Sequence, residues 1–275
     1  MSDFARFAIA YLKGAAAAAI VIDEDGVGLT QTLAHLTQVG FTNIVIAARY
    51  DLDFDPGHPV HRIEGNDYGK VLTPVIQALA GQWLHLCFNA EFLMFPFAES
   101  RTIHDFCDFL KDERRKTAHV IVVDHYARDL SASDYGYSED EVLFDGGGYF
   151  ARHSQTMDDP KEPLVEVIGG LRWRHEEEFP QDRRRCSRAS LFRCRQDAVL
   201  GSDFLFTDIH LNALQCPWHN SPSAALRSFR AAKYLMINPG SRARLDTLVW
   251  ERSVPCDWSA QQMMDYGFIE PGQWF

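Results

Sequence analysis

A short apolar run that leads straight into one carboxylate is the feature that most constrains the fold of this chain. The run Trp83–Phe88 predicts a buried strand, and Glu91 follows it before the chain turns apolar again. Ligands of open α/β sheets bind at the carboxyl ends of the strands. We therefore expect a central strand that delivers Glu91 to a site at the edge of a sheet.

Strand-like and helix-like segments alternate through the first half of the chain. Apolar runs predict strands at residues 15–22, 43–48, 60–63 and 118–123. Helical spacing predicts one helix beginning near Leu29 and two more over residues 70–80 and 102–115. Continuous apolar strands separated by helices are typical of a mostly parallel central sheet with helices on both faces, so we predict an α/β fold.

The second half changes character after residue 124, where aromatic, glycine-rich and charged segments follow one another. Short strands are expected at residues 164–168 and 190–194, and a helix at residues 224–236. We see no internal repeat and no low-complexity linker. The chain of 275 residues is therefore predicted to be a single domain with an elaborated C-terminal half.

Composition argues against several classes of protein. The formal net charge of −11 disfavours nucleic acid or an anionic membrane as the main partner, because both would repel the chain. The six cysteines show no CxxC pair, which disfavours a zinc site or a disulfide framework. The longest apolar run near the start, residues 15–22, is too short to span a bilayer. We expect a cytoplasmic protein without a transmembrane segment.

Several motifs follow one another in a specific order. An acidic turn at residues 22–24 is followed by a His-then-Gly segment at residues 33–41, and then by the strand from Trp83 to Leu93. An aromatic-Asp segment at residues 144–149 and a Gly-Gly-x-Arg-x-Arg segment at residues 169–174 come later. Over roughly residues 18–270, this order resembles bacterial family 2-like glycosyltransferases of the GT-A fold.

The strand from Trp83 departs from the pattern of that family. The family's strand ends in an Asp-x-Asp motif whose carboxylates help to hold a divalent cation, Mn²⁺ or Mg²⁺, on the donor diphosphate. Phe88 and Ala90 stand at the two aspartate positions, and Glu91 alone is kept. Glu91 is thus the one candidate metal ligand of this motif. Its alternative role is that of a structural carboxylate hydrogen-bonded to the backbone of the next turn, which is favoured because one carboxylate rarely holds magnesium alone.

The resemblance implies that a nucleotide-sugar donor binds at the acidic turn and at the end of this strand. The residues concerned are Asp23, Glu24, Asp25, Asn89 and Glu91. For the three residues of the turn, capping of the helix that begins at Leu29 is an equally good interpretation.

Six arginines lie within residues 183–195 of an otherwise acidic chain. We hypothesise that arginines replace the missing cation in holding a diphosphate, because a guanidinium suits phosphate oxygens bidentately. The candidates are Arg172, Arg174, Arg188 and Arg193. Arg188 stands where the family has lysine, and the family's later histidine is missing from residues 214–216. The alternative is a solvated basic face that pairs with the carboxylates of residues 176–178 and 182.

Glycosyl transfer with inversion needs a carboxylate that removes the proton of the acceptor hydroxyl. Asp145, Asp203 and Asp208 are the candidate catalytic bases, although single aspartates beside glycine or serine more often cap turns. Four aromatic residues are candidates for stacking on sugar rings, with packing in the core as the alternative. They are Tyr135, Tyr149, Trp173 and Trp218.

The resemblance therefore implies a glycosyltransferase of polysaccharide biosynthesis. Residues 1–125 would bind the nucleotide-sugar, and residues 126–275 would shape the acceptor side. The donor would be a nucleotide-sugar, and the acceptor a saccharide or surface polymer. The alternative is a glycosyltransferase-like binding or scaffold protein without activity. A protein partner or a homo-oligomer is compatible with either function.

Overall fold

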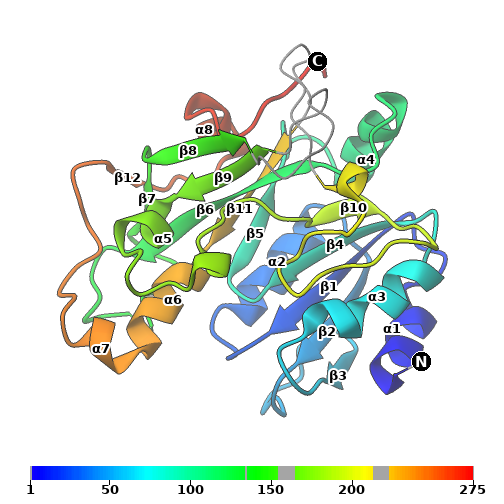
Figure 1. Ribbon diagram of the computed structural model, residues 1–275, viewed down its shortest axis with the longest axis horizontal. Coiled ribbons are helices and arrows are strands. Elements are labelled where there is room, and N and C mark those ends of the chain that lie inside the picture. The colour runs from blue at the N-terminus through cyan, green and yellow to red at the C-terminus, as the bar shows by residue number, and fades with distance from the viewer. Residues whose placement is uncertain (1, 134, 154–164, 213–222, 275) are drawn as a thin grey trace.

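The computed structural model describes residues 2–133, 135–153, 165–212 and 223–274. These residues form a mixed α/β fold with two five-stranded sheets, a two-stranded sheet and surrounding helices (Figure 1). None of the described helices combines the length and the apolarity that crossing a bilayer requires. Residues 214–216 and Trp218 lie outside the described residues.

The first sheet holds the strands that the first half of the sequence predicts. Its order is β10 (Leu191–Arg193), β4 (Trp83–Phe88), β1 (Ala17–Asp23), β2 (Asn43–Ala48) and β3 (Val60–Arg62). β1 is parallel to β4 and β2, and β2 is parallel to β3, whereas β10 is antiparallel to β4. Every residue of β1 and β4 is buried, which explains their nearly unbroken apolar sequences.

Helices cover both faces of this sheet, as predicted. α2 (Leu29–Gln38) and α4 (Ile103–Asp112) pack on one face, and α1 (Asp3–Leu12) and α3 (Tyr68–Ala78) pack on the other. Side chains alternate along each strand, so β1 contributes to the apolar cores on both faces. α1 is an additional helix that the sequence analysis does not predict.

A second sheet follows directly from the first. After β4 the chain turns at Asn89 and Ala90, where Ala90 has a φ of +59°, and enters β5 (Glu91–Met94). The sheet order is β12 (Ser253–Pro255), β7 (Val142–Asp145), β6 (His119–Ala127), β11 (Ser223–Ser228) and β5. Only β6 and β11 are parallel in this sheet, whereas the other three pairs are antiparallel. The prediction of a mostly parallel sheet therefore holds for the first sheet alone.

The predicted helix over residues 224–236 is wrong in its first part. Residues Ser223–Ser228 form β11, which is fully buried between β6 and β5, and the helix α6 (Arg230–Ile237) begins only afterwards. Alanine and leucine favour a helix by local propensity, but two neighbouring strands outweigh that preference here. β11 thus brings the start of α6 to the end of the sheet.

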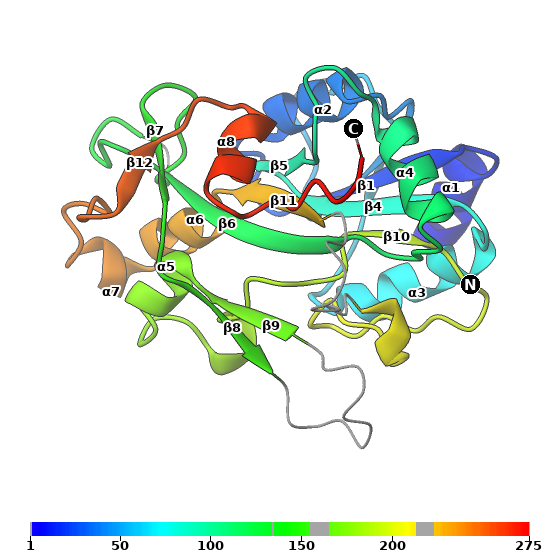
Figure 2. The same cartoon turned by 90° about the horizontal axis from the view of Figure 1, so that it is seen from above.

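The remaining described elements lie around this framework. β8 (Tyr149–His153) and β9 (Val165–Gly169) form an antiparallel pair, and α5 (Gly170–Arg174) follows β9 directly. Figure 2 shows β8 and β9 projecting away from the second sheet at the bottom of the view. The other short helices are η1 (Gln181–Arg183), η2 (Ile209–Leu211), α7 (Pro239–Arg242) and α8 (Ala260–Asp265).

Candidate functional site

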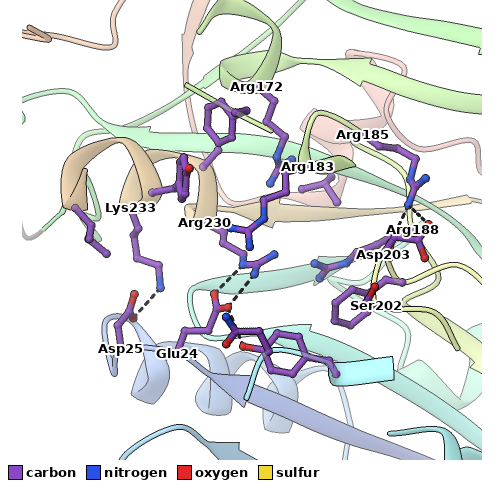
Figure 3. Close-up of a pocket in the computed structure, with 18 of the residues that line it drawn as sticks. Glu24, Asp25, Arg172, Arg183, Arg185, Arg188, Ser202, Asp203, Arg230 and Lys233 are labelled. Carbon is purple, nitrogen blue, oxygen red and sulfur yellow. Dashed lines mark hydrogen bonds and ion pairs between the residues drawn. The ribbon is translucent and has the colours of Figure 1, made fainter. Parts of the chain in front are cut away.

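A cavity of about 520 Å³ lies where the parallel strands of the first sheet end. Glu24 and Asp25 directly follow β1, and Arg49 directly follows β2, so all three come from carboxyl ends of strands. The opposite wall comes from the second half of the chain, including α5 and α6 (Figure 3). The cavity therefore lies at the sheet edge where open α/β folds bind ligands.

Among the described residues that line this cavity, basic side chains outnumber carboxylates seven to three. The basic ones are Arg49, Arg172, Arg183, Arg185, Arg188, Arg230 and Lys233, and the acidic ones are Glu24, Asp25 and Asp203. This excess contrasts with the formal net charge of −11 of the whole chain. A cleft lined by one sign of charge concentrates ligands of the opposite sign, so the cavity suits an anion.

Asn89 holds the acidic turn in place from behind the cavity. Its side chain accepts a hydrogen bond from the Glu24 backbone N–H at 3.0 Å and donates to the Val27 carbonyl at 2.9 Å and to the Asp25 carboxylate. Asn89 is fully buried and is not part of the cavity wall. It positions Glu24 and Asp25, which do line the cavity, whereas Asn89 itself does not.

Asp23 is likewise buried behind the turn. Its carboxylate accepts hydrogen bonds from the Tyr50 hydroxyl at 2.6 Å and from the Gly26 backbone N–H at 2.9 Å. Burial raises the pKa of Asp23, and these hydrogen bonds oppose the rise. Asp23 therefore shapes the turn and lies outside the cavity wall. The alternative role in capping α2 is not observed either, since the N-cap of α2 is Gly28 and no side chain caps it.

Two cations from α6 face the acidic turn. Arg230 donates through Nε and Nη2 to the two carboxylate oxygens of Glu24, at 2.8 Å each, and Lys233 Nζ lies 2.9 Å from the carboxylate of Asp25. Burial alone would raise the pKa of Glu24, but the charge and hydrogen bonds of Arg230 outweigh it and lower the pKa to about 2. Neither cation is predicted from the sequence, because the residues of β11 have a helix-like pattern that hides where α6 begins.

The ring of Phe88 packs against the guanidinium groups of two arginines. Phe88 stands at the first aspartate position of the Asp-x-Asp motif in the family that the sequence resembles. The guanidinium carbon of Arg230 lies 3.6 Å from the centre of the Phe88 ring, and that of Arg188 lies 4.9 Å from it. The face of an aromatic ring attracts a cation electrostatically. Two guanidinium groups therefore gather over the ring of this residue.

Glu91 is fully buried and directed toward protein groups. Its carboxylate accepts hydrogen bonds from the Phe88 backbone N–H at 2.8 Å and from Ser228 Oγ at 2.9 Å, and it forms an ion pair with Arg188. These donors use the oxygens that a metal ion would need, so Glu91 does not fit the role of metal ligand. Among the described residues, no three His, Cys, Asp or Glu side chains form a group that could hold a metal ion.

The arginine-rich segment contributes to the cavity only in part. Arg183, Arg185 and Arg188 line it. Arg193 does not, because it lies on the edge strand β10, where its Nε donates to a backbone carbonyl at 3.0 Å. Arg188 and its neighbours Arg183 and Arg185 therefore lie where an anion in the cavity would meet them, whereas Arg193 does not.

α5 directs its two arginines to different places. Arg172 lines the cavity and pairs at 3.0 Å with a buried aspartate of β6. Arg174 pairs at 2.9 Å with Asp145, outside the cavity wall. Asp145 is fully buried and also accepts hydrogen bonds from the Tyr126 hydroxyl and from Trp250 Nε1, at 2.6 Å each. Arg174 and Asp145 therefore form a structural pair, not a donor contact and a base.

Asp203 alone among the three candidate bases lines the cavity. Its carboxylate lies 3.2 Å from Arg185 Nη2, and its side chain is 41% exposed. Asp208 lies elsewhere: it caps η2 by accepting a hydrogen bond from the His210 backbone N–H at 3.0 Å, and it pairs with Arg195 at 2.8 Å. The turn-capping alternative therefore describes Asp208.

The site that emerges is a basic cavity at the ends of parallel strands, with two arginines over the Phe88 ring. Donor-site residues that the sequence predicts and that line it are Glu24, Asp25, Arg172 and Arg188. Comparison with known proteins finds no family model and no curated protein that matches this chain.

Proposed function

We propose that this protein is a GT-A-like glycosyltransferase that holds the diphosphate of a nucleotide-sugar with arginines instead of a divalent cation. The observation that supports this most is the pair of guanidinium groups of Arg188 and Arg230 over the Phe88 ring. They stand at the motif position that, by the resemblance, would otherwise serve the metal. A cavity of about 520 Å³ also lies within the usual range of roughly 300–1,000 Å³ for small-molecule sites.

The proposed reaction needs positive charge where the leaving group forms. The acceptor oxygen attacks the anomeric carbon of the donor, the bond from that carbon to the diphosphate oxygen breaks, and the nucleoside diphosphate departs with both bonding electrons. Arginine donors fixed in advance around the diphosphate stabilise the charge that develops there. Asp203 takes the acceptor proton, since it is the candidate base that lines the cavity.

A second function, binding of the nucleotide-sugar without transfer, is favoured by one feature of the same cavity. Each of the three carboxylates in its described wall lies in an ion pair, Glu24 with Arg230, Asp25 with Lys233 and Asp203 with Arg185. A cationic partner stabilises the ionised form of a carboxylate and weakens it as a base. The two functions differ in whether Asp203 accepts a proton during turnover.

Calorimetric titration with UDP and GDP tests the anion site. Binding is expected both in EDTA and in Mn²⁺, with similar affinity. Arg183→Ala is the informative variant, because Arg183 lies over the Tyr234 ring at 5.9 Å and not in one of the three ion pairs above. One charge-assisted hydrogen bond contributes about 1.5–3 kcal/mol, so affinity is expected to fall roughly 10-fold or more.

Arg193→Ala is the matched control, since it removes the same charge from outside the cavity. Its affinity for UDP and GDP is expected to stay within about twofold of the wild type. Two results contradict the arginine site. One is that UDP and GDP do not bind in EDTA but bind once Mn²⁺ is added. The other is that Arg183→Ala and Arg193→Ala lose affinity equally. Incubation with UDP-glucose and GDP-mannose and a saccharide mixture then separates the two functions. Release of UDP or GDP that Asp203→Asn abolishes supports transfer, whereas binding without release supports the binding protein.

A further inference from the structure

A second cavity of about 610 Å³ adjoins the first and shares Arg172 and Arg185 with it. It is lined by β9, by α5 and by the segment around η1. Its described wall therefore comes from the second half of the chain, including β9, which pairs with β8. Figure 2 shows where these two strands and α5 lie. A ligand in this cavity would meet a ligand in the first one at the two shared arginines.

An exposed aromatic pair marks this second cavity. Trp173 lines it and is 43% exposed, although it is one of the largest apolar side chains of the protein. The ring of Phe150, itself 48% exposed, lies 5.3 Å from the Trp173 ring at an interplanar angle of 63°. Of its neighbours on α5, Arg172 lines both cavities and Arg174 points toward Asp145. Exposed aromatic surface beside a cavity is a feature of binding sites.

The described wall of the second cavity has three arginines and two carboxylates, so its charges are closer to balance than those of the first cavity. Arg184 Nη1 lies 3.2 Å from the Glu176 carboxylate, and Arg185 Nη1 lies 3.6 Å from that of Glu166. These pairs present hydrogen-bond donors and acceptors side by side without a large net charge. The wall therefore suits a ligand with many hydroxyl groups and no charge of its own.

Together these features point to a saccharide. A pyranose ring offers a C–H face that packs on an aromatic ring and an edge of hydroxyl groups that both donate and accept hydrogen bonds. We infer that the second cavity binds a neutral saccharide, with Trp173 as the platform for one sugar ring. Its identification as the acceptor of the transfer rests on the proposed function.

Arg185 connects the two cavities in a way that fits this assignment. Its Nη1 faces Glu166 in the second cavity at 3.6 Å, and its Nη2 faces Asp203 in the first at 3.2 Å. A hydroxyl group of the saccharide that reaches this junction comes next to Asp203, the proposed base. Arg185 is a positioning residue in this arrangement, because it orients the carboxylate and does not exchange a proton itself.

Titration of the full chain with oligosaccharides tests the inference. The probes are maltohexaose, cellohexaose and mannohexaose as neutral ligands and an oligogalacturonate of similar length as the charged one, followed by saturation-transfer NMR and tryptophan fluorescence. At least one neutral probe is expected to bind. Trp173→Ala is expected to weaken that binding about 10-fold or more, and Trp173→Phe, which keeps an aromatic face, by about threefold or less.

Two controls separate this site from the donor site and from misfolding. Tyr11→Ala removes another exposed aromatic residue, 50% exposed on α1, and is expected to leave saccharide binding unchanged. UDP affinity is expected to stay within about twofold in every variant, because Trp173 does not line the first cavity.

The results divide cleanly between the two proposals. Any of three results overturns the saccharide site: no neutral probe binds, only the oligogalacturonate binds, or Trp173→Ala binds the saccharide as tightly as the wild type. Equal losses in Trp173→Ala and Trp173→Phe together with loss of UDP affinity also overturn it, since they indicate a structural role. Saccharide binding without any UDP or GDP binding leaves this site in place and refutes the proposed function instead.

Discussion

Replacing Glu91 by glutamine removes the charge that compensates Arg188. The Glu91 side chain is 0% exposed and that of Arg188 is 10% exposed, so the substitution leaves a buried guanidinium without its counter-charge. The new amide group also brings a donor to a place where Phe88 and Ser228 already donate. Breaking a buried ion pair in this way costs about 3–5 kcal/mol. With an unfolding entropy of about 2 cal/mol/K per residue, Tm should fall by roughly 5–9 °C for 275 residues.

Thermal and urea denaturation measure this change directly. Arg188→Met and the double variant complete a cycle, and the double variant should lose less stability than the two single variants together, because no unpaired charge then remains. Glu113→Gln, on the surface at the end of α4, is the control and should stay within about 0.5 kcal/mol of the wild type. A Glu91→Gln protein as stable as the wild type refutes the structural role. An Mn²⁺-dependent rise in Tm that Glu91→Gln abolishes refutes it equally, since it shows that Glu91 holds a metal ion.

Acid should destabilise the protein well above the pH at which ordinary exposed carboxylates are protonated. Burial is the main cause that lowers the pKa of four histidines, to about 4 for His35, 3 for His85 and 4 for His119, and well below the usual value for His125. The unfolded chain therefore binds more protons below roughly pH 6.5, and each of these histidines lowers the free energy of unfolding by about 1.4 kcal/mol per pH unit down toward pH 4. Three buried aspartates oppose part of this loss, because burial raises the pKa of Asp124 to about 6 and also raises those of Asp23 and Asp145. Urea midpoints at pH 7 and pH 5 check this, and a midpoint that does not fall at pH 5 contradicts it. Asp145→Asn should lower stability by about 3–5 kcal/mol, because it leaves the Arg174 guanidinium unpaired, while UDP affinity of the folded protein stays unchanged. Loss of glycosyl transfer at unchanged Tm would instead identify Asp145 as the base.

Local sequence patterns were sufficient for the first sheet. Unbroken apolar runs such as those of β1 and β4 reflect burial on both faces, and helical spacing around them predicted helices on both sides. The same reasoning failed at β11, where an Ala-Ala-Leu sequence has a helical propensity that strand pairing on both sides overrides. The local pattern also predicted the acidic turn at the correct edge of the sheet, because a turn that follows a parallel strand lies at the carboxyl end of that strand.

The sequence by itself determined which segments are buried and where the ends of the parallel strands lie, since burial leaves a local periodic pattern. Only the tertiary structure decided which charges meet. Glu24 and Arg230 are 206 residues apart, and Glu91 and Arg188 are 97 apart, yet each pair is joined directly. No local pattern records such pairs, because an ion pair depends on where two distant segments pack. For the same reason, the sequence does not distinguish Arg188, which lines the cavity, from Arg193, which lies outside it.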